Sequence, residues 1–166
     1  HYINGQWVES TGTETFDSYN PVNRQLLAQT RLGSESDADA AVQAAVAAQS
    51  RFALTSREER LALLQRIGAS FKQHMPALID AVQQSLGAPR MLCERLQVPA
   101  GLMQVQAWSK LLSEFAFEET RNGNLLVQQP LGVSLCITSW NWPLNGPMGG
   151  VAAVTGRRLR HGLEAK

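Results

Sequence analysis

A chain of 166 residues, 44% hydrophobic and 17% charged, is long enough for one domain with its own core, and its composition is that of a globular protein. The formal net charge of +1 gives no electrostatic reason to expect nucleic acid or an acidic membrane surface as a partner. The apolar stretches are too short to cross a bilayer, and the N-terminus lacks a signal-peptide core, so we expect a soluble, cytoplasmic protein. Two cysteines favour a reducing compartment, and the three histidines show no metal-ligand spacing, so no metal site is predicted.

The N-terminal part of the sequence predicts extended structure. Asn4-Gly5 interrupts a short alternation of apolar and polar residues, which is a strong β-hairpin signal. Asn20-Pro21 predicts a turn, and Leu26-Leu27 lies inside a second short strand.

Helices are predicted next. Ser36 is expected to cap a helix that opens with Asp37 and Asp39, because acidic side chains favour the positive end of the backbone dipole. Ser56 and Glu59 form a capping-box pattern at the start of a second helix. Residues at helical spacing, interpreted as core positions, are Val42, Ala45, Val46 and Gln49 in the first helix and Leu61, Leu64, Ile67 and Phe71 in the second.

Proline and glycine are expected to divide the rest of the helical region. Pro76 is predicted to open a new helix, which Gly87 and Pro89 end. A longer helical stretch is predicted from about Met91 to Phe117, bent or interrupted at Pro99. The inward positions expected in these two helices are Leu78, Ile79 and Val82, then Leu92, Leu96, Met103 and Trp108.

The segment "NLLVQQPLGVSLCIT" follows an Asn122-Gly123 turn and predicts two short strands separated by Pro130 and Gly132. The second is hydrophobic enough to be buried on both faces, as in a parallel α/β sheet, and it would bury Cys136 as an inert thiol. A parallel strand needs neighbours to pair its backbone. We therefore expect the sequence to start a doubly wound sheet near Gly132 without supplying its other strands.

The string "ITSWNWPL" at the end of this strand places an amide between two indoles. In a structural interpretation, Trp140 and Trp142 are core aromatics and Asn141 is a turn residue suited to a strand end. The octapeptide alone favours that interpretation.

The longer stretch "PLGVSLCITSWNWPL" resembles the aldehyde dehydrogenase superfamily, whose segment reads Pro-x-Gly-Val, a few apolar residues and Trp-Asn-x-Pro. Four other stretches are similar in the same order: "YINGQWV", "YNPVNRQLLAQTRLGSESDADAAVQAAVAA", "REERLALLQRIGASF" and "LGAPR". The resemblance runs from about Tyr2 to Leu144 and covers about the first third of a family chain. It implies an α/β fold: hairpin strands, then helices, then the first strand of a truncated Rossmann-type sheet.

The resemblance also implies a division of the chain. Residues 1–131 would hold the oligomerisation strands and the helical part of the cofactor domain. Residues 132–145 would form the first strand and turn of a truncated dinucleotide-binding sheet, and residues 146–166 a divergent tail.

The chemistry implied by the resemblance centres on Asn141. In the family, the matching asparagine donates its side-chain NH2 to the aldehyde oxygen, and a prepositioned donor stabilises that oxygen as it becomes anionic. Aspartate could not replace it, because a carboxylate has no N–H and would repel the oxyanion. Thr138, Ser139, Trp140 and Asn141 are matched to the nicotinamide end of NAD or NADP. With the resemblance, the catalytic interpretation of Asn141 is favoured, while Trp142 remains a packing residue.

Three parts of the family's chemistry have no match in this sequence: the catalytic cysteine, the general-base glutamate, and the Gly-rich turn with its Lys-Pro-Ser-Glu segment. Neither Cys93 nor Cys136 lies at the nucleophile position. We therefore expect a fragment of an NAD(P)-dependent aldehyde dehydrogenase that is inactive by itself, with little reason to expect that it alone binds the dinucleotide. The alternative is a non-catalytic interaction module that forms homo-oligomers or associates with a full-length homologue.

The tail is expected to lack the family's structure. Four glycines between Gly146 and Gly156 and few large apolar residues are a poor basis for ordered structure. The string "LRHGLEAK" can be encoded so that a one-base step reads Cys-Gly-Met-Val-Leu-Lys-Pro, similar to the family's second strand and cofactor lysine. This predicts a frameshift after Asn145, which the nucleotide sequence of the gene would test.

Overall fold

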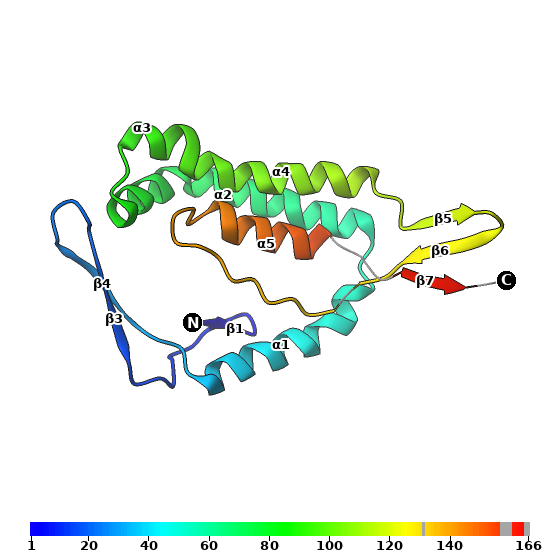
Figure 1. The fold of residues 1–166 in the computed structure, drawn as a ribbon, viewed down its shortest axis with the longest axis horizontal. Coiled ribbons are helices and arrows are strands. Elements are labelled where there is room, and N and C mark those ends of the chain that lie inside the picture. The colour runs from blue at the N-terminus through cyan, green and yellow to red at the C-terminus, as the bar shows by residue number, and fades with distance from the viewer. Residues whose placement is uncertain (131, 157–160, 165–166) are drawn as a thin grey trace.

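The computed structural model describes residues 1–130 and 132–156, and the backbone of residues 161–164. It is a mixed α/β structure in which short antiparallel strand pairs flank a group of helices (Figure 1). In chain order the elements are β1 (Tyr2–Ile3), β2 (Gln6–Trp7), β3 (Thr15–Tyr19), β4 (Leu26–Arg31), α1 (Glu35–Ala53), α2 (Arg57–Leu86), α3 (Arg90–Leu92), a π-helical turn (Cys93–Gln97), α4 (Val98–Glu114), β5 (Glu118–Arg121), β6 (Asn124–Gln128), α5 (Asn145–Gly156) and β7 (His161–Glu164).

The hairpin predicted at Asn4-Gly5 forms, and so do the predicted turn at Asn20-Pro21 and the strand that contains Leu26-Leu27. β1 pairs antiparallel with β2, and the turn residues Asn4 and Gly5 have positive φ angles of 52° and 77°, as a tight hairpin turn requires. β3 pairs antiparallel with β4. The turn between them is closed by Asn20, whose Oδ1 accepts from the Val22 backbone N–H at 2.9 Å. Both turns predicted from short residue pairs, Asn4-Gly5 and Asn20-Pro21, are therefore confirmed.

The start of α1 differs from the prediction. Ser34, not Ser36, is the N-cap, and Asp37 lies at the third helical position. The two form a reciprocal capping box: Ser34 Oγ accepts from the Asp37 N–H at 3.2 Å, and Asp37 Oδ2 accepts from the Ser34 N–H at 2.9 Å. The Asp37 carboxylate also accepts the Ser10 hydroxyl at 2.6 Å. Because Asp37 is needed as the partner of Ser34, the cap lies two residues earlier than expected.

The capping box predicted for α2 is confirmed, and the new helix predicted at Pro76 is wrong. Ser56 Oγ accepts from the Glu59 N–H at 3.1 Å, and Glu59 Oε2 accepts from the Ser56 N–H at 2.7 Å. α2 then runs through Pro76, which is exposed. Proline removes one backbone hydrogen bond, to the Lys72 carbonyl, and on an exposed face water can satisfy that carbonyl. Gly87 ends the helix in the left-handed conformation, as predicted.

The helical stretch after Pro89 contains a π-turn. The Val98 N–H bonds to the Cys93 carbonyl, five residues back, and Pro99 follows at once. The predicted interruption at Pro99 is confirmed, whereas three predicted core positions, Leu92, Leu96 and Met103, are exposed and Trp108 is only half-buried. The extra residue of the π-turn changes which side chains face inward. The buried positions are Cys93, Gln97, Val98, Gly101, Val105 and Leu112.

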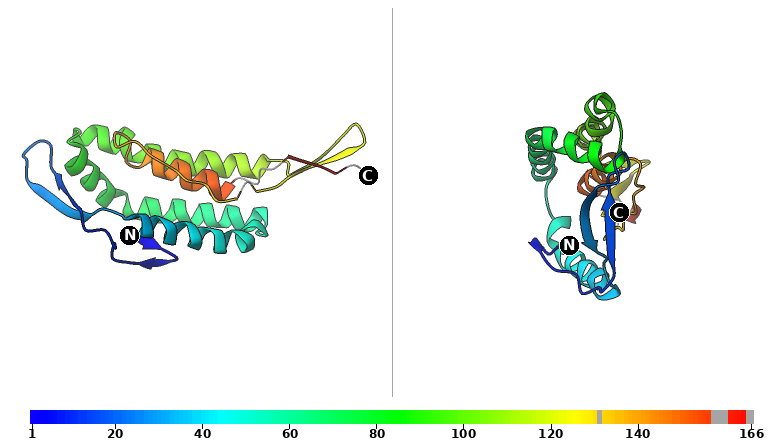
Figure 2. Two further views of the ribbon diagram at one scale, coloured as in Figure 1. Left: turned by 60° about the horizontal axis from the view of Figure 1, so that its bottom comes forward. Right: turned by 90° about the vertical axis from the view of Figure 1, so that its left-hand side faces the viewer.

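The core lies between α2, the π-turn, α4 and α5, in two clusters. The first contains Phe71, Ile79, Val82, Cys93 and Val98, with Leu78, Leu144 and Met148 packed against it. The second contains Leu64, Val105, Leu112 and Ala152, with Leu61, Ile67 and Trp108 against it. The apolar stripe predicted for α2 is thus confirmed. Figure 2 shows the β3–β4 hairpin and the β5–β6 hairpin projecting from opposite ends of the helical group.

The third sheet has the order β5-β6-β7, and all its pairs are antiparallel. Its first turn is the predicted Asn122-Gly123, whereas β5 itself was not predicted. Residues 132–139, expected as a strand buried on both faces, run extended with no strand pairing. Leu135 and Ile137 are 85% and 89% exposed, and Cys136 is exposed. The expected burial is wrong for this chain, because the described residues supply no neighbouring strand to cover the segment.

The segment after Asn145 is also more ordered than predicted. α5 occupies Asn145–Gly156 and buries Ala152, Thr155 and Gly156. Its glycines permit close contact: a Cβ on Gly150 would lie 2.9 Å from Cys136 Sγ, and one on Gly156 would lie 3.3 Å from the Trp108 ring. The same glycines that indicated disorder therefore let the helix approach its neighbours. The frameshift remains a prediction, and the string on which it rests, residues 159–166, is described only for the backbone of residues 161–164.

Candidate functional site

The predicted site lies in the turn that joins the extended segment to α5. Residues 140–144 form this turn, which we call the Asn141 turn. The Gly146 N–H bonds to the Trp142 carbonyl at 3.2 Å, and the Met148 N–H to the Leu144 carbonyl at 3.0 Å, so the turn leads directly into the helix. Leu144 and Met148 both pack against the first core cluster. Burial of these two apolar side chains fixes the turn beside α4.

The four residues matched to the cofactor, Thr138, Ser139, Trp140 and Asn141, are all exposed. Trp140 is 86% exposed, while Trp142 is half-buried, in line with the packing role predicted for it. Thr138 lies against the first turn of α5, where a Cβ on Gly146 would be 3.1 Å from the Thr138 Cβ. The structure thus brings Thr138 to the beginning of the helix that follows Asn141.

The side-chain amide of Asn141 makes no hydrogen bond within the described part of the chain. A turn asparagine usually bonds to its own backbone, as Asn20 does through Oδ1. Asn141 instead uses its backbone: its carbonyl accepts from Gln97 Nε2 at 3.4 Å. Its amide is therefore available to donate to a group outside this chain.

Two glutamines that the sequence analysis did not single out contact this region. Gln97, the last residue of the π-turn, bonds to Asn141, and Gln104 Nε2 bonds to Asn145 Oδ1 at 2.8 Å. Between them, a Cβ on Gly101 would lie 3.1 Å from the Leu144 Cβ. Gln97, Gly101 and Gln104 are four and three residues apart, so the sequence indicates that they share one helix face. Nothing in the sequence showed which loop that face would contact.

Cys136 lies beside a cavity of about 170 Å³ that also involves Arg60, Phe52 and Gly150. Arg60 is buried there and donates to the carbonyls of Phe52 at 2.8 Å and Thr155 at 3.3 Å, which links the end of α1 to α5. The guanidinium also stacks on the Phe52 ring, 4.7 Å from its centroid. Arg60 thus has a structural role that explains why a charged residue is tolerated in the interior.

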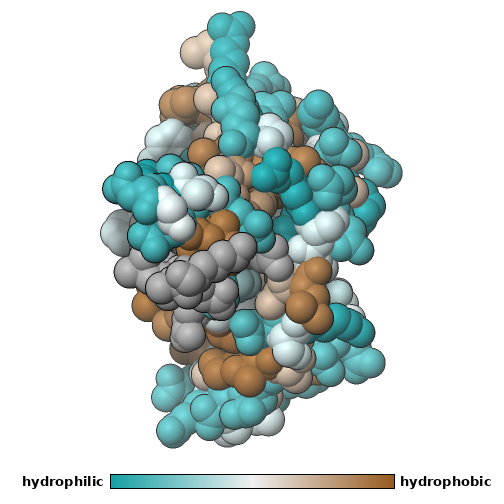
Figure 3. Space-filling view, turned by 90° about the vertical axis from the view of Figure 1, so that its right-hand side faces the viewer, coloured by the Kyte–Doolittle hydropathy of each residue, from teal (hydrophilic) through white to brown (hydrophobic). Residues whose placement is uncertain are grey.

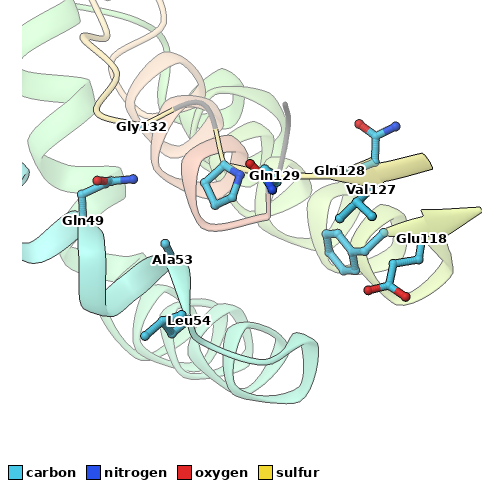
Figure 4. Close-up of a pocket in the computed structure, with 10 residues that line it drawn as sticks. Gln49, Ala53, Leu54, Glu118, Val127, Gln128, Gln129 and Gly132 are labelled. Carbon is cyan, nitrogen blue, oxygen red and sulfur yellow. The ribbon is translucent and has the colours of Figure 1, made fainter. Parts of the chain in front are cut away.

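A larger cavity, of about 590 Å³, lies between the end of α1 and the base of the β5–β6 hairpin (Figure 4). Gln49, Ala53 and Leu54 line it from α1, and Glu118 and Val127 line it from the hairpin. None of the four matched residues lines this cavity. Seen from the hairpin end, the surface mixes apolar and polar residues (Figure 3).

The described residues contain no group of three or more His, Cys, Asp or Glu side chains placed to hold a metal ion. In the same part of the chain, none of the helices combines the length and the apolarity that a membrane span requires.

The known proteins that this chain resembles are aldehyde dehydrogenases. The model of the aldehyde dehydrogenase family matches residues 7–156, past Leu144 and through α5. A putative aldehyde dehydrogenase from Staphylococcus aureus is 39% identical over 144 residues, which are 87% of this chain and 30% of that protein.

Solved structures of aldehyde dehydrogenases are similar to this chain in fold, and two of them illustrate the likeness. A mutant of aldehyde dehydrogenase C from Pseudomonas syringae, in complex with NAD+ and octanal, has a TM-score of 0.90 and 30% identity, covering 93% of this chain and 32% of that one. An aldehyde dehydrogenase from Bartonella henselae has a TM-score of 0.89 and 28% identity, covering 93% and 33%. The chain thus spans about a third of the length of these relatives. The family match from residue 7 to residue 156 includes the extended segment, the Trp-Asn-x-Pro turn and the helix that follows it. This chain therefore belongs to the aldehyde dehydrogenase family.

Proposed function

We propose that this chain is the N-terminal part of an NAD(P)-dependent aldehyde dehydrogenase, whose complete form oxidises an aldehyde to a carboxylic acid. In this proposal Asn141 donates its side-chain N–H to the aldehyde oxygen. The observation that carries it is the side-chain amide of Asn141, which has no hydrogen-bond partner among the described residues and lies in a turn whose backbone is bonded to Gln97. A fixed donor lowers the barrier because it needs no reorganisation when negative charge develops on the oxygen.

The exposed surface beside Asn141 fits one wall of a dinucleotide site. The hydroxyls of Thr138 and Ser139 have no hydrogen-bond partner among the described residues, and the Trp140 indole is exposed. In the proposed enzyme these residues hold the nicotinamide end of NAD or NADP, which accepts a hydride from the substrate. Trp140 would exclude water from that side, while Asn141 orients the carbonyl.

Residues 1–166 alone are proposed to be inactive. The family's nucleophile and general base have no match in this sequence, and loss of an essential nucleophile abolishes covalent catalysis. We expect no aldehyde-dependent formation of NADH or NADPH by the purified chain. Turnover that persisted after Asn141→Ala would contradict both the inactivity and the role of Asn141.

The nucleotide sequence downstream of residue 166 gives the next test. A continuing open reading frame, in either the same or a shifted frame, should encode the family's cysteine. In the complete protein, Asn141→Ala should lower kcat by about 10²- to 10³-fold with a smaller effect on KM. Asn141→Asp should be at least as damaging, whereas Trp142→Phe, which keeps an aromatic packing residue, should remain close to wild type. An Asn141→Ala enzyme with wild-type kcat would refute the assigned role.

A second candidate function is a non-catalytic interaction module. It is favoured by residues 132–139, an extended segment without a strand partner that exposes Leu135 and Ile137. Such a segment can pair with a strand of another copy or of a complete homologue. Size-exclusion chromatography with light scattering tests this: a discrete oligomer supports the module, and a polydisperse aggregate opposes it.

A further inference from the structure

Gln97 is a buried polar residue in an apolar neighbourhood. It is 8% exposed, and Cys93 and Val98, which flank it in and after the π-turn, are fully buried. Its side-chain nitrogen bonds to the Asn141 carbonyl at 3.4 Å, whereas its Oε1 is buried and has no hydrogen-bond partner among the described residues. A buried amide with an unpaired oxygen is less stable than an apolar side chain of similar size. Core packing alone therefore does not explain a glutamine at this position.

The π-turn decides where Gln97 faces. A π-turn inserts one residue into a helix, rotates the following positions relative to a regular α-helix, and is frequently found at functional sites. Here it ends at Gln97, and Pro99, which has no N–H to donate, comes two residues later. The interruption places Gln97 opposite the Asn141 turn.

The following positions continue the same contact. Gln97, Gly101 and Gln104 share one helix face and meet Asn141, Leu144 and Asn145 in the same order. The Gln104 bond, at 2.8 Å, fixes the beginning of α5. Gly101 lets the Leu144 backbone approach, because a Cβ there would be 3.2 Å from the Leu144 oxygen. The Gln97 bond is longer, but it is the one described hydrogen bond between the helix and the Asn141 residue itself.

We propose that Gln97 is a positioning residue: its amide fixes the main-chain carbonyl of Asn141 and thereby the direction from which the Asn141 side chain donates. The inference rests on the proposed function of Asn141 as the donor to the substrate oxygen. Catalytic groups must be held within about 0.5 Å of the productive geometry by residues that are themselves locked in place. Gln97 meets that condition because burial restricts its rotamers.

The test uses the 166-residue chain labelled with ¹³C and ¹⁵N for solution NMR. Gln97→Met keeps the size of the side chain and removes the donor, and Gln97→Glu keeps its shape and replaces the donor by a carboxylate. Both variants should shift the carbonyl carbon of Asn141 upfield and broaden the amide signal of Trp142, while the signals of Asn145 stay in place. The matched control, Gln104→Met, should move Asn145 and leave the Asn141 carbonyl unchanged.

The inference is overturned if both Gln97 variants leave the Asn141 carbonyl signal at its wild-type position, or if Gln104→Met moves it equally. If the far-ultraviolet circular dichroism of Gln97→Met shows that this variant is unfolded, the Asn141 carbonyl signal of Gln97→Glu alone tests the inference. These signals report the geometry of the turn and not the chemistry. A wild-type kcat for Asn141→Ala in the complete enzyme would therefore refute the proposed function while leaving the contact intact, and the two failures are distinguishable.

Discussion

Gly101 on α4 lies so close to Leu144 in the Asn141 turn that a Cβ on the glycine would be 3.1 Å from the leucine Cβ. The same added atom would lie 3.1 Å from Phe71 Cζ, in the first core cluster. The turn is therefore packed so closely against the helix that a methyl group there would require Leu144 or Phe71 to shift by a few tenths of an ångström.

Gly101→Ala should destabilise the protein. Overpacking costs about 1–3 kcal/mol, which exceeds the gain of about 0.5–1 kcal/mol from replacing a helical glycine by alanine. The matched control is Gly68→Ala on α2, where a Cβ would make ordinary contacts of 3.7 Å with Val105 and 3.8 Å with Leu102. Urea unfolding should give a lower midpoint for Gly101→Ala and a higher one for Gly68→Ala. Equal midpoints would show that the turn yields without strain.

Alanine substitutions at Gly87 and Gly123 should distinguish the cost of backbone strain from the cost of a steric clash. Both have positive φ angles, of 69° and 81°. A Cβ on Gly123 would meet nothing within 4 Å, whereas one on Gly87 would be 2.7 Å from Pro21 Cγ. Gly123→Ala should lower the free energy of unfolding by about 1–2 kcal/mol. Gly87→Ala should lower it further, because the end of α2 must also move away from the β3–β4 turn. The difference between the two in urea unfolding measures that packing.

Asp37 should make stability depend on pH in the acid range. The Ser10 hydroxyl, together with the Ser34 and Thr11 backbone N–H groups, holds the pKa of the Asp37 carboxyl well below its usual value. The pKa is lower in the folded than in the unfolded state, so the stabilisation is complete above the ordinary Asp pKa of about 3.9. It is lost as the pH falls from there through the folded-state value.

Urea midpoints measured as the pH is lowered should therefore fall, and fall less steeply in Ser10→Ala, which removes the strongest donor. Ser36→Ala is the control, because the Ser36 hydroxyl bonds to Thr11 and Ser34 and not to Asp37. If Ser10→Ala and Ser36→Ala flatten the profile equally, the Asp37 hydrogen bonds are not its cause.

The exposed extended segment should control self-association. Replacing Leu135 and Ile137 together by lysine removes two side chains that are 85% and 89% exposed and adds charge to an open edge. Light scattering should show less concentration-dependent association in this double variant. Leu54→Lys is the control, since Leu54 is 81% exposed at the end of α1. An equal effect of Leu54→Lys would mean that general surface hydrophobicity, and not the segment, drives association.

Local chemistry in this sequence was enough to predict several elements. The Asn4-Gly5 turn and the Ser56–Glu59 capping box depend on residues within a few positions of each other, and both form as expected. Pro76 and Ser36 were misinterpreted because each has a local preference that a stronger neighbouring signal overrides. Pro76 lies inside the continuous helix α2, and Ser34, not Ser36, caps α1 because it forms the capping box with Asp37.

Features that depend on distant segments could not be predicted. The burial expected for Cys136 needs a neighbouring strand, which the described residues do not supply. The contact of Gln97 with Asn141 joins residues 44 positions apart, and it requires the π-turn, whose extra residue has no periodic signature. The matched residues Thr138 to Asn141 could be located from the family resemblance, but their open surroundings could not.

Because of the π-turn, the number of residues in the segment 93–97 determines which side chains of α4 face the Asn141 turn. Each residue of an α-helix turns the chain by about 100°. A single deletion that restored regular helix there would rotate Gly101 and Gln104 off the loop, although the amino-acid composition would hardly change. In this stretch, the number of residues is therefore constrained more tightly than the identity of most of them.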